Sequence, residues 1–329
     1  MRTIMYSEAI REAMREEMRK NRQVLLIGEE VGQGYGGAFG VSKGLFDEFG
    51  PQQVIDTPIC ESAIIGCAIG ASMLGMKPIA EIMFEDFIAV PFDQVINQAA
   101  KIKFMSGEQY RASIVIRTPG GCGGGTGPHH SQCLEALFMH IPGLLIAMPA
   151  NAYDAKGLLK TALHLDDPVL FFEHKKLYKV KGEVPEEEYT VPFGQGKIVR
   201  PGKDLTVVAL SYMVKVAEEA AVELQERYQF ELEIIDPRTI VPLDLALITE
   251  SVAKTHKAAV IEEGVLRAGV GAEIAAQIQA QAFDELDFPI LRIASRNTPI
   301  PMTPLMEQSV IPNKARIVAE ICQLVGLGG

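Results

Sequence analysis

Glu61 is the residue whose type and position point most directly to chemistry. It stands at the start of an apolar segment in which no other charged residue occurs before Lys77. Its carboxyl is either a first-turn acid favoured by the helix dipole, or a reacting group held in a dry pocket that raises its pKa. Spacing alone favours the first interpretation, although Thr57 lies four residues before Glu61, which misses the three-residue spacing of a capping box.

Two adjacent histidines, His129 and His130, form the second candidate site. They follow a glycine-rich loop after the predicted strand at 114–116. Such loops at the carboxyl ends of strands are where α/β sheets bind ligands. The loop lacks the Gly-Lys-Ser/Thr of a phosphate-binding P-loop. The histidines are therefore either ordinary loop residues or part of a substrate-facing site.

A third candidate is the literal G-x-G-x-x-G match formed by Gly32, Gly34 and Gly37, with Asp56 where a ribose-binding acid would stand. In a dinucleotide-binding fingerprint the third glycine lies inside the helix, whereas here we expect the helix to begin at Ser42. We interpret the stretch as a flexible glycine loop. A nicotinamide-binding oxidoreductase stays open as a rival function, which titration with a nicotinamide cofactor would test.

Elements that must position these residues follow an alternating pattern of short apolar runs and amphipathic segments. This pattern predicts an α/β protein with two domains, each with a mostly parallel sheet flanked by helices. The predicted boundaries are a first domain at 1–180, a linker at 181–203 rich in Pro, Gly and charged residues, and a second domain at 204–329. Predicted strands lie at 24–27, 54–55, 79–83, 114–116, 144–148, 169–172, 205–210, 232–235, 258–261 and 290–293, and predicted helices include 7–20, 61–76 and 91–105.

The helix predicted after Glu61 is rich in small residues, with Gly66 and Gly70 spaced so that another backbone could approach closely. Its uncharged run from Ala63 to Met76 is shorter than the ~18 residues of a membrane-spanning helix. We therefore expect a buried helix that packs on a sheet or on a partner helix.

Composition excludes several classes of protein. The 329 residues carry a net charge of −11, which argues against a nucleic-acid-binding protein. Five cysteines without a C-x-x-C pair make a zinc site unexpected and are typical of reduced thiols in the cytoplasm. The amphipathic segment 7–20 is too acidic for a transit peptide, and we predict neither a signal peptide nor a membrane partner.

A set of ordered motifs resembles the beta subunit of the thiamine-diphosphate-dependent decarboxylase component of 2-oxo acid dehydrogenase complexes, of the pyruvate or acetoin type. The similarity covers essentially the whole chain and implies a pyrimidine-binding domain followed by a transketolase C-terminal-like domain. The motifs are Gly-Glu-Glu-Val at 28–31, Asp-Thr-Pro-Ile-x-Glu at 56–61, Phe-x-Asp-Phe at 84–87, Asp-Gln-x-Ile-Asn-Gln-Ala-Ala-Lys at 93–101, His-Ser-Gln at 130–132, Asp-Ala-Lys-Gly-Leu at 154–158, Asp-Pro-Arg-Thr at 236–239 and Pro-Leu-Asp at 242–244.

The resemblance implies roles for four of these residues. It places Glu61 against the aminopyrimidine ring nitrogen of the coenzyme, where a carboxyl that shares a proton favours the imino tautomer. It implies that Phe87 stacks on the aminopyrimidine, although most phenylalanines are core residues. Ile59 would make a backbone contact to the same ring, and His130 would act in proton transfer while the acyl group moves to a lipoyl arm.

The resemblance also implies cofactors and partners. Thiamine diphosphate needs magnesium, which the family holds with a Gly-Asp-Gly segment that this sequence lacks. We therefore expect an alpha subunit to hold most of the Mg²⁺ in an α2β2 heterotetramer. Further expected partners are a lipoyl acyltransferase core component and a 2-oxo acid substrate. A potassium ion is implied at Ile114, Ala162, Leu165 and Asp167.

The substrate is the point on which the motifs disagree. Pyruvate is the predicted 2-oxo acid, with an acetoin dehydrogenase or a branched-chain 2-oxo acid dehydrogenase beta subunit as alternatives. The stretch 173–187 is similar to acetoin enzymes, and the stretch 254–287 is similar to pyruvate enzymes. A non-catalytic scaffold is a further alternative, which replacement of Glu61 would separate from an enzyme.

Overall fold

The computed structural model describes residues 1–32 and 34–328 of the chain. These residues form two compact units, each of which is described by itself. The first unit comprises Met1–Gly120 and Leu137–Phe193, and the second comprises Gly121–Ala136 and Gly194–Gly329. The loop that carries His129 and His130 therefore belongs to the second unit, although the chain on both sides of it belongs to the first.

A parallel sheet with strand order β6-β7-β5-β4-β2-β3 forms the core of the first unit. Strands β2, β5 and β7 are buried along their whole length, as expected for a parallel sheet covered on both faces. The strands are β2 (Val24–Glu29), β3 (Val54–Thr57), β4 (Lys77–Glu81), β5 (Val115–Gly120), β6 (Leu145–Ala147) and β7 (Val169–His174).

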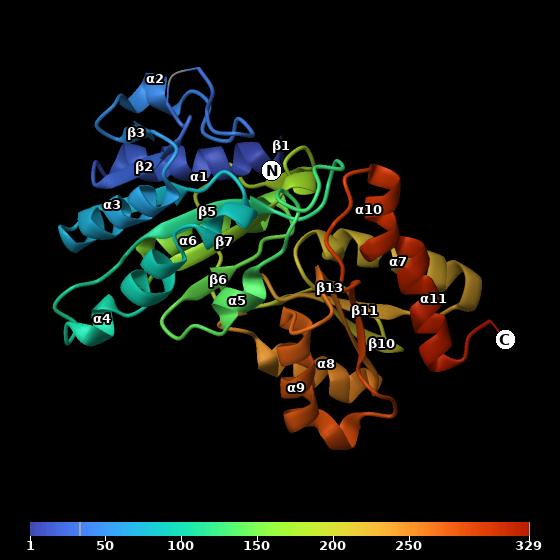
Figure 1. Ribbon diagram of the computed structural model, residues 1–329. Coiled ribbons are helices and arrows are strands. Elements are labelled where there is room, and N and C mark those ends of the chain that lie inside the picture. The colour runs from blue at the N-terminus through green and yellow to red at the C-terminus, as the bar shows by residue number, and fades with distance from the viewer. Residues whose placement is uncertain (33, 329) are drawn as a thin grey trace. The chain divides into compact units, whose positions relative to one another are not determined.

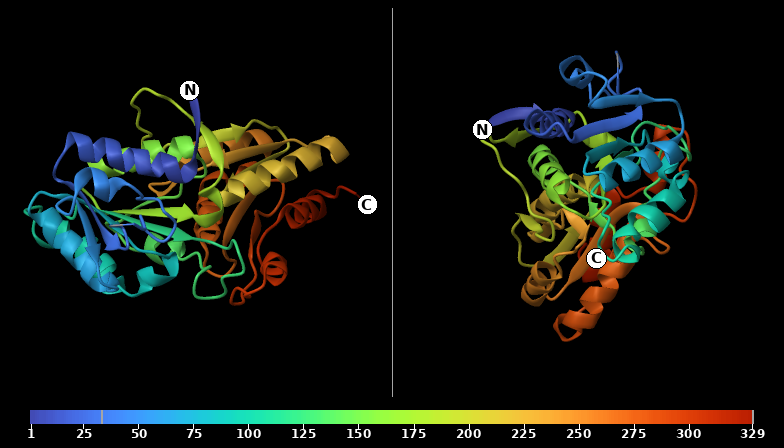
Figure 2. Two further views of the ribbon diagram at one scale, coloured as in Figure 1. Left: turned by 90° about the horizontal axis from the view of Figure 1, so that it is seen from above. Right: turned by 90° about the vertical axis from the view of Figure 1, so that its left-hand side faces the viewer.

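Helices cover both faces of this sheet. Figure 2 shows α1 (Tyr6–Lys20) on one side and α3 (Glu61–Met73) on the other. Helix α6 (Ala152–His164) packs against α1, where Lys156 Nζ lies 2.6 Å from Glu16 Oε1 and Lys160 Nζ lies 2.8 Å from Glu16 Oε2. Both lysines are fully buried. Because a buried ammonium is costly without a partner, these ion pairs specify how α1 lies on α6.

The smaller elements of the first unit differ from the sequence-based expectation in two places. The helix expected at 91–105 is a π-helical turn at Gln94–Ala99 followed by the short helix α4 (Ile102–Met105). The helix after the glycine loop is α2 (Leu45–Phe49), which begins three residues later than predicted because Gly44 has a φ of 83°. Strand β1 (Arg2–Met5) pairs antiparallel with β8 (Lys181–Val184).

The second unit contains a sheet with strand order β14-β13-β10-β11-β9, in which only the edge strand β9 is antiparallel to its neighbour. Figure 1 shows α8 and α9 together on one side of this sheet and α7 and α11 on the other. The strands of this sheet are β9 (Lys197–Arg200), β10 (Leu205–Ala209), β11 (Leu232–Asp236), β13 (Ala258–Val265) and β14 (Leu291–Ser295), and the short strand β12 (Thr239–Val241) of the same unit lies outside it. Its helices are α7 (Tyr212–Tyr228), α8 (Leu245–Thr255), α9 (Val270–Ala282), α10 (Pro304–Val310) and α11 (Lys314–Val325).

The predicted fold class, two α/β domains with mostly parallel sheets, is confirmed. The boundary between the units lies after Phe193, within the predicted linker at 181–203. The segment before this boundary packs on α6. The backbone N–H of Val191 donates to the carbonyl of Gly157 at 3.1 Å, and a Cβ on Gly157 would collide with Val191. Residues 181–203 thus supply a strand to each unit.

Among the described residues, the helices are all too short or too polar to cross a lipid bilayer.

Candidate active site

Glu61 is the first residue of α3 and is half-buried. The preceding residue, Cys60, is the N-cap and makes no side-chain capping bond. Glu29, at the end of the buried strand β2, has its pKa raised by burial, and the negative charge of Glu61 raises it further. The carboxyl group of Glu61 therefore acts on that of Glu29 at the carboxyl end of this sheet, which is where α/β proteins bind ligands.

One face of α3 is uncovered in this chain. Its buried side packs on the sheet, but Ala63, Gly66, Cys67 and Gly70 are exposed, and a Cβ added at Gly66 or Gly70 would meet no atom within 4 Å. Among residues 1–32 and 34–328, no other backbone makes the predicted close approach to these glycines. A helix that is apolar on all sides and exposed on one of them indicates a missing neighbour. The buried side consists of Ile64, Ile65, Ala68, Ile69 and Ser72.

Phe87 lies in a 3₁₀ turn, Glu85–Ala89, which follows β4 after three residues, and it is half-buried. Its ring contacts Phe84 edge to face, with centroids 5.6 Å apart and planes at 70°. The hydroxyl of Ser62 donates to the carbonyl of Val90 at 3.4 Å, which ties the first turn of α3 to the segment after Phe87. Ile59, just before α3, is 83% exposed, so its side chain is free of packing in this chain.

A buried ion network lies in the same unit. Arg117 of β5 is 1% exposed and donates two hydrogen bonds to Glu173, at 2.6 and 2.9 Å, and one to Glu81 at 2.8 Å. The Tyr178 hydroxyl donates to Glu173 at 2.7 Å. Burial alone would lower the pKa of Arg117, but the two carboxylates raise it. Burial raises the pKa of Glu81 and of Tyr178.

This network was not expected from the sequence. The only signal for it was a single arginine inside an otherwise apolar strand, and such a residue reads equally well as a strand end. The two glutamates that pair with Arg117 lie 36 and 56 residues away from it in the chain, so no local spacing connects them.

The glycine loop is packed tightly onto this network. The N–H of Gly37 donates to the carbonyl of Glu30 at 2.8 Å, and Gly37 has a φ of 77°. A Cβ on Gly37 would collide with the Glu81 carboxylate. Asp56 Oδ1 accepts a bond from the N–H of Gly32 at 3.2 Å. Asp56 therefore holds the loop, and the loop leads into turns before α2, which disfavours the dinucleotide-binding alternative.

In the second unit, His129 and His130 lie on the segment 121–136. The Thr126 hydroxyl donates to the carbonyl of His130 at 3.2 Å and contacts the Ser131 hydroxyl at 2.8 Å. His129 lines a cavity of about 530 Å³ beside the carboxyl ends of β13 and β14, together with Arg267. The structure thus places His129 in a cavity wall and His130 half-buried in an ordered turn.

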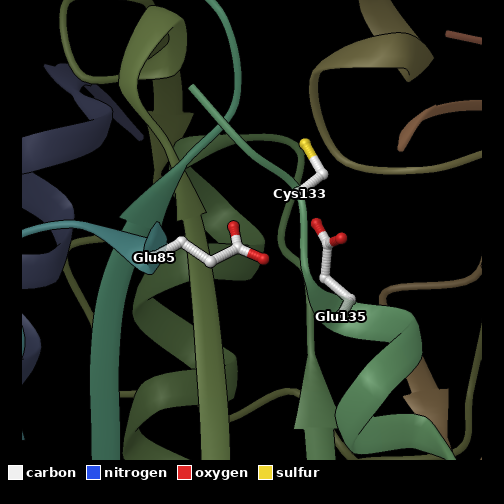
Figure 3. A group of neighbouring side chains, drawn as sticks. All are labelled: Glu85, Cys133 and Glu135. Atoms are coloured by element: carbon white, nitrogen blue, oxygen red, sulfur yellow. The ribbon is translucent and has the colours of Figure 1, made fainter. Parts of the chain in front are cut away.

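Three buried carboxyl groups of the second unit belong to Glu135, at the end of this segment, and to Glu262 and Glu263 of β13. Burial raises the pKa of Glu135 to about 8, with contributions from Glu262 and Glu263, and burial raises the pKa of Glu262 to about 7. Glu263 accepts a hydrogen bond from the N–H of Cys122, and Glu262 accepts one from Gly271 at 3.0 Å. Figure 3 shows Glu135 at the start of α5 (Glu135–Met139). Of these carboxyls, that of Glu263 holds the segment that carries the histidines, through Cys122, whereas that of Glu262 holds the start of α9.

The residues expected to surround a potassium ion lie in the first unit. Cationic side chains already contact two of them: Lys77 Nζ lies 3.3 Å from the Leu165 carbonyl, and Lys103 Nζ lies 2.7 Å from Asp167 Oδ1. The other two carbonyls accept backbone hydrogen bonds. They belong to Ile114, which accepts from Val169 at 2.9 Å, and to Ala162, which accepts from Leu165 at 3.3 Å.

Comparison with known proteins gives a consistent picture. Residues 2–181 match the pyrimidine binding domain of transketolase, and residues 194–317 match the transketolase C-terminal domain. Among solved structures, a split gene transketolase described as an inactive beta4 tetramer superposes with a TM-score of 0.79 over 99% of both chains. Its sequence identity of 21% makes this a likeness of fold alone.

Three similar proteins align with nearly the whole chain. The beta subunit of acetoin:2,6-dichlorophenolindophenol oxidoreductase of Bacillus subtilis (strain 168) is 45% identical, over 99% of this chain and 98% of that protein. The pyruvate dehydrogenase E1 component subunit beta of Rhizobium meliloti (strain 1021) is 46% identical, over 97% of this chain and 69% of that protein. The 2-oxoisovalerate dehydrogenase subunit beta of Bacillus subtilis (strain 168) is 42% identical, over 98% of this chain and 99% of that protein.

Proposed function

The chain belongs to the family of E1 beta subunits of thiamine-diphosphate-dependent 2-oxo acid dehydrogenases, and on this premise we propose that it is the beta subunit of a pyruvate dehydrogenase. In this proposal it works with an alpha subunit in an α2β2 enzyme. That enzyme decarboxylates pyruvate oxidatively and passes the acyl group to the lipoyl domain of an acyltransferase core.

The residues of the first unit fit the pyrimidine half of thiamine diphosphate. When bound, this coenzyme supplies an electron-accepting ring for decarboxylation. Glu61, half-buried at the start of α3, would hold a proton at the pyrimidine ring nitrogen, and Phe87 would stack on the ring. The backbone before α3, at Ile59, would contact the same ring. From the second unit, His130 would move a proton during acyl transfer.

The observation that carries the proposal is the uncovered face of α3. Glu61 stands at one end of this face, and Gly66 and Gly70 leave it open. A split site follows, because the sequence has no Gly-Asp-Gly segment for magnesium. We propose that an alpha subunit covers α3 and supplies the half of the site that holds Mg²⁺ and the diphosphate.

Isothermal titration calorimetry tests the split site. The purified chain with Mg²⁺ should show no strong binding of thiamine diphosphate, and binding should appear once an alpha subunit is added. Micromolar binding by the chain alone would contradict the proposal, and so would the absence of binding by the assembled enzyme.

Glu61→Gln tests the chemistry. Glutamine has nearly the same shape as glutamate but cannot exchange the proton, so kcat of the assembled enzyme should fall by roughly 100-fold or more. Asp47→Asn, which removes an exposed carboxylate from α2 of the same unit, is the matched control and should leave kcat unchanged. Near-normal turnover of the Glu61→Gln enzyme would refute the role and would favour a non-catalytic scaffold.

The choice of pyruvate as substrate and the binding of potassium are tested by separate experiments. Steady-state assays with pyruvate, branched-chain 2-oxo acids and acetoin distinguish the three activities that the names of the relatives suggest. For potassium, the apparent unfolding temperature of the enzyme in KCl should exceed that in NaCl. Equal unfolding temperatures in the two salts would refute the potassium site, and the ammonium groups of Lys77 and Lys103 would then be the cations of that region.

A further inference from the structure

Phe39 connects the glycine loop to the candidate pyrimidine site within the first unit. It lies near the end of the loop and contacts two aromatic rings. The centroid of its ring is 5.4 Å from that of Phe84, with the planes at 71°, and 5.3 Å from that of Tyr178, with the planes at 42°. Phe84 in turn contacts Phe87. The rings of Tyr178, Phe39, Phe84 and Phe87 therefore form a continuous row that ends at the proposed pyrimidine contact.

The row is anchored at the end away from Phe87. Tyr178 is buried, and its hydroxyl donates to Glu173, which also accepts hydrogen bonds from Nε and Nη2 of Arg117. The ring of Tyr178 also lies 6.1 Å from that of Tyr6 on α1. A side chain with this many partners has one orientation, so it gives Phe39 a rigid surface to pack on.

The backbone on both sides of Phe39 is also held. Before it, the N–H of Gly37 donates to the carbonyl of Glu30. After it, the guanidinium of Arg11 donates to the carbonyl of Gly40 at 2.6 Å and to that of Val41 at 2.8 Å. The loop is therefore fixed at two points that flank Phe39, even though its ring is 39% exposed. The ring contacts both the buried Tyr178 and the half-buried Phe84.

Phe84 needs such support because it is only half-buried and lies at the N-cap of the 3₁₀ turn that carries Phe87. On another side, Lys175 Nζ lies 5.5 Å from the centroid of its ring, within cation–π range. Phe84 is thus held between a cation, Phe39 and Phe87.

We propose that Phe39 is a positioning residue, which fixes the ring of Phe87 through Phe84 so that the coenzyme pyrimidine meets a surface of set orientation. The inference rests on the proposed function, because it requires Phe87 to contact the pyrimidine. It gives the glycine loop, which the dinucleotide interpretation left without a role, a role in coenzyme affinity. Phe39 itself takes no part in the chemistry.

Coenzyme affinity of the assembled enzyme tests this inference. A ring pair of this geometry corresponds to roughly a two- to tenfold change in an equilibrium constant. Calorimetry with thiamine diphosphate and Mg²⁺ should therefore show a Kd about three- to tenfold higher for Phe39→Leu, which keeps an apolar side chain but removes the ring. Phe39→Tyr, which restores the ring, should bind within about twofold of the unchanged enzyme. At saturating coenzyme, kcat should stay within about twofold for both variants.

Two further variants separate positioning from general loosening of the loop. Tyr35→Leu removes a ring from the same loop at a residue that is 66% exposed, and its Kd should not change. Phe84→Leu should raise Kd about as much as Phe39→Leu, and the double variant should raise it no further than the larger single effect. This non-additivity is expected because both substitutions break the same row of contacts.

The outcomes separate the inference from the proposed function. If the unchanged enzyme binds the coenzyme and Phe39→Leu binds equally well, the inference is wrong while the proposed function stands. Equal weakening by Phe39→Leu and Phe39→Tyr, or a loss of kcat without a change of Kd, would also overturn it. An unchanged assembled enzyme that fails to bind the coenzyme would overturn both.

Discussion

Replacing Arg117 by methionine tests how far the buried ion network holds the first unit together. Arg117 makes three charge-assisted hydrogen bonds to two buried carboxyl groups, those of Glu81 and Glu173. Methionine is unbranched and apolar but ends where arginine has Nε, so the guanidinium position, 3.7 Å from Met14 Sδ, is left empty. The substitution therefore removes the charge and the hydrogen bonds and adds the cost of a small cavity.

The expected loss is large because the carboxyl groups stay behind. Removing one partner of a buried ion pair costs about 3–5 kcal/mol, since the remaining charge is uncompensated. That range corresponds to roughly a hundredfold to several thousandfold change in the unfolding equilibrium constant. Arg19, which pairs with Glu48 on the surface with its side chain 60% exposed, is the matched control. Arg19→Met should lose less than about 1 kcal/mol.

Urea-induced unfolding measures both variants. The chain has no tryptophan, so far-ultraviolet circular dichroism of the purified chain is the suitable signal. The transition that shifts in Arg117→Met identifies the first unit, and any second transition should stay in place. Adding Glu81→Gln and Glu173→Gln to the same chain should recover much of the loss, because no buried charge then lacks a partner.

The effect should also depend on pH. Burial already raises the pKa of Glu81, and loss of Arg117 would raise it further. A carboxyl whose folded-state pKa is raised stabilises the fold at low pH, and that contribution is lost as pH rises. Arg117→Met should therefore be less destabilising near pH 5 than near pH 8. An Arg117→Met chain that loses no more stability than Arg19→Met, at either pH, would refute the reasoning.

Three further predictions concern other parts of the chain. His130→Ala should impair acyl transfer to a lipoylated domain more than turnover with an artificial electron acceptor, and equal losses would mean that His130 serves the whole cycle or only packs. Because the pKa of Glu135 is raised to about 8, the second unit should lose stability as pH rises from about 4.5 to 8, by at most about 1.4 kcal/mol per pH unit for this group. Glu135→Gln should flatten that slope in urea unfolding at several pH values, and an unchanged slope would assign it to other groups. Gly37→Ala should lower the stability of the first unit by roughly 1–3 kcal/mol, since it combines a positive φ with a collision against Glu81; a thermal scan that shows no loss would contradict this.

The parts of the fold that sequence predicted well are those set by local periodicity. The apolar runs at 24–27 and 169–172 are strands because a parallel sheet covered on both faces needs continuous apolar stretches. The helix after Glu61 also lies where its uncharged run predicted it. Its burial was predicted less well, because periodicity cannot say which face a partner chain covers.

Features set by distant contacts escaped sequence analysis. The glycine loop matched a dinucleotide-binding pattern, but Gly37 is needed for contact with Glu81 of β4 and Gly32 for contact with Asp56 of β3. The stretch 181–203 looked like a linker because of its composition, whereas pairing of β8 with β1 and of β9 with β11 structures both of its ends. The composition of a segment shows only its own residues, whereas strand pairing depends on the strand beside it, which can come from a distant part of the chain.

The discontinuity of the second unit has a consequence for how the protein is made. Residues 121–136 are held by residues that come much later in the chain: the N–H of Gly125 donates to Glu307 at 2.9 Å, and the N–H of Cys122 donates to Glu263. The segment therefore leaves the ribosome long before its partners. During synthesis the segment 121–136 must therefore stay without its hydrogen-bond partners until most of the chain has emerged. Cleavage of the chain after Phe193 would leave the same segment on the N-terminal fragment, although it belongs to the second unit. Two fragments divided there should assemble only when expressed together, and nascent chains stalled before residue 263 should be cleaved by proteases within 121–136.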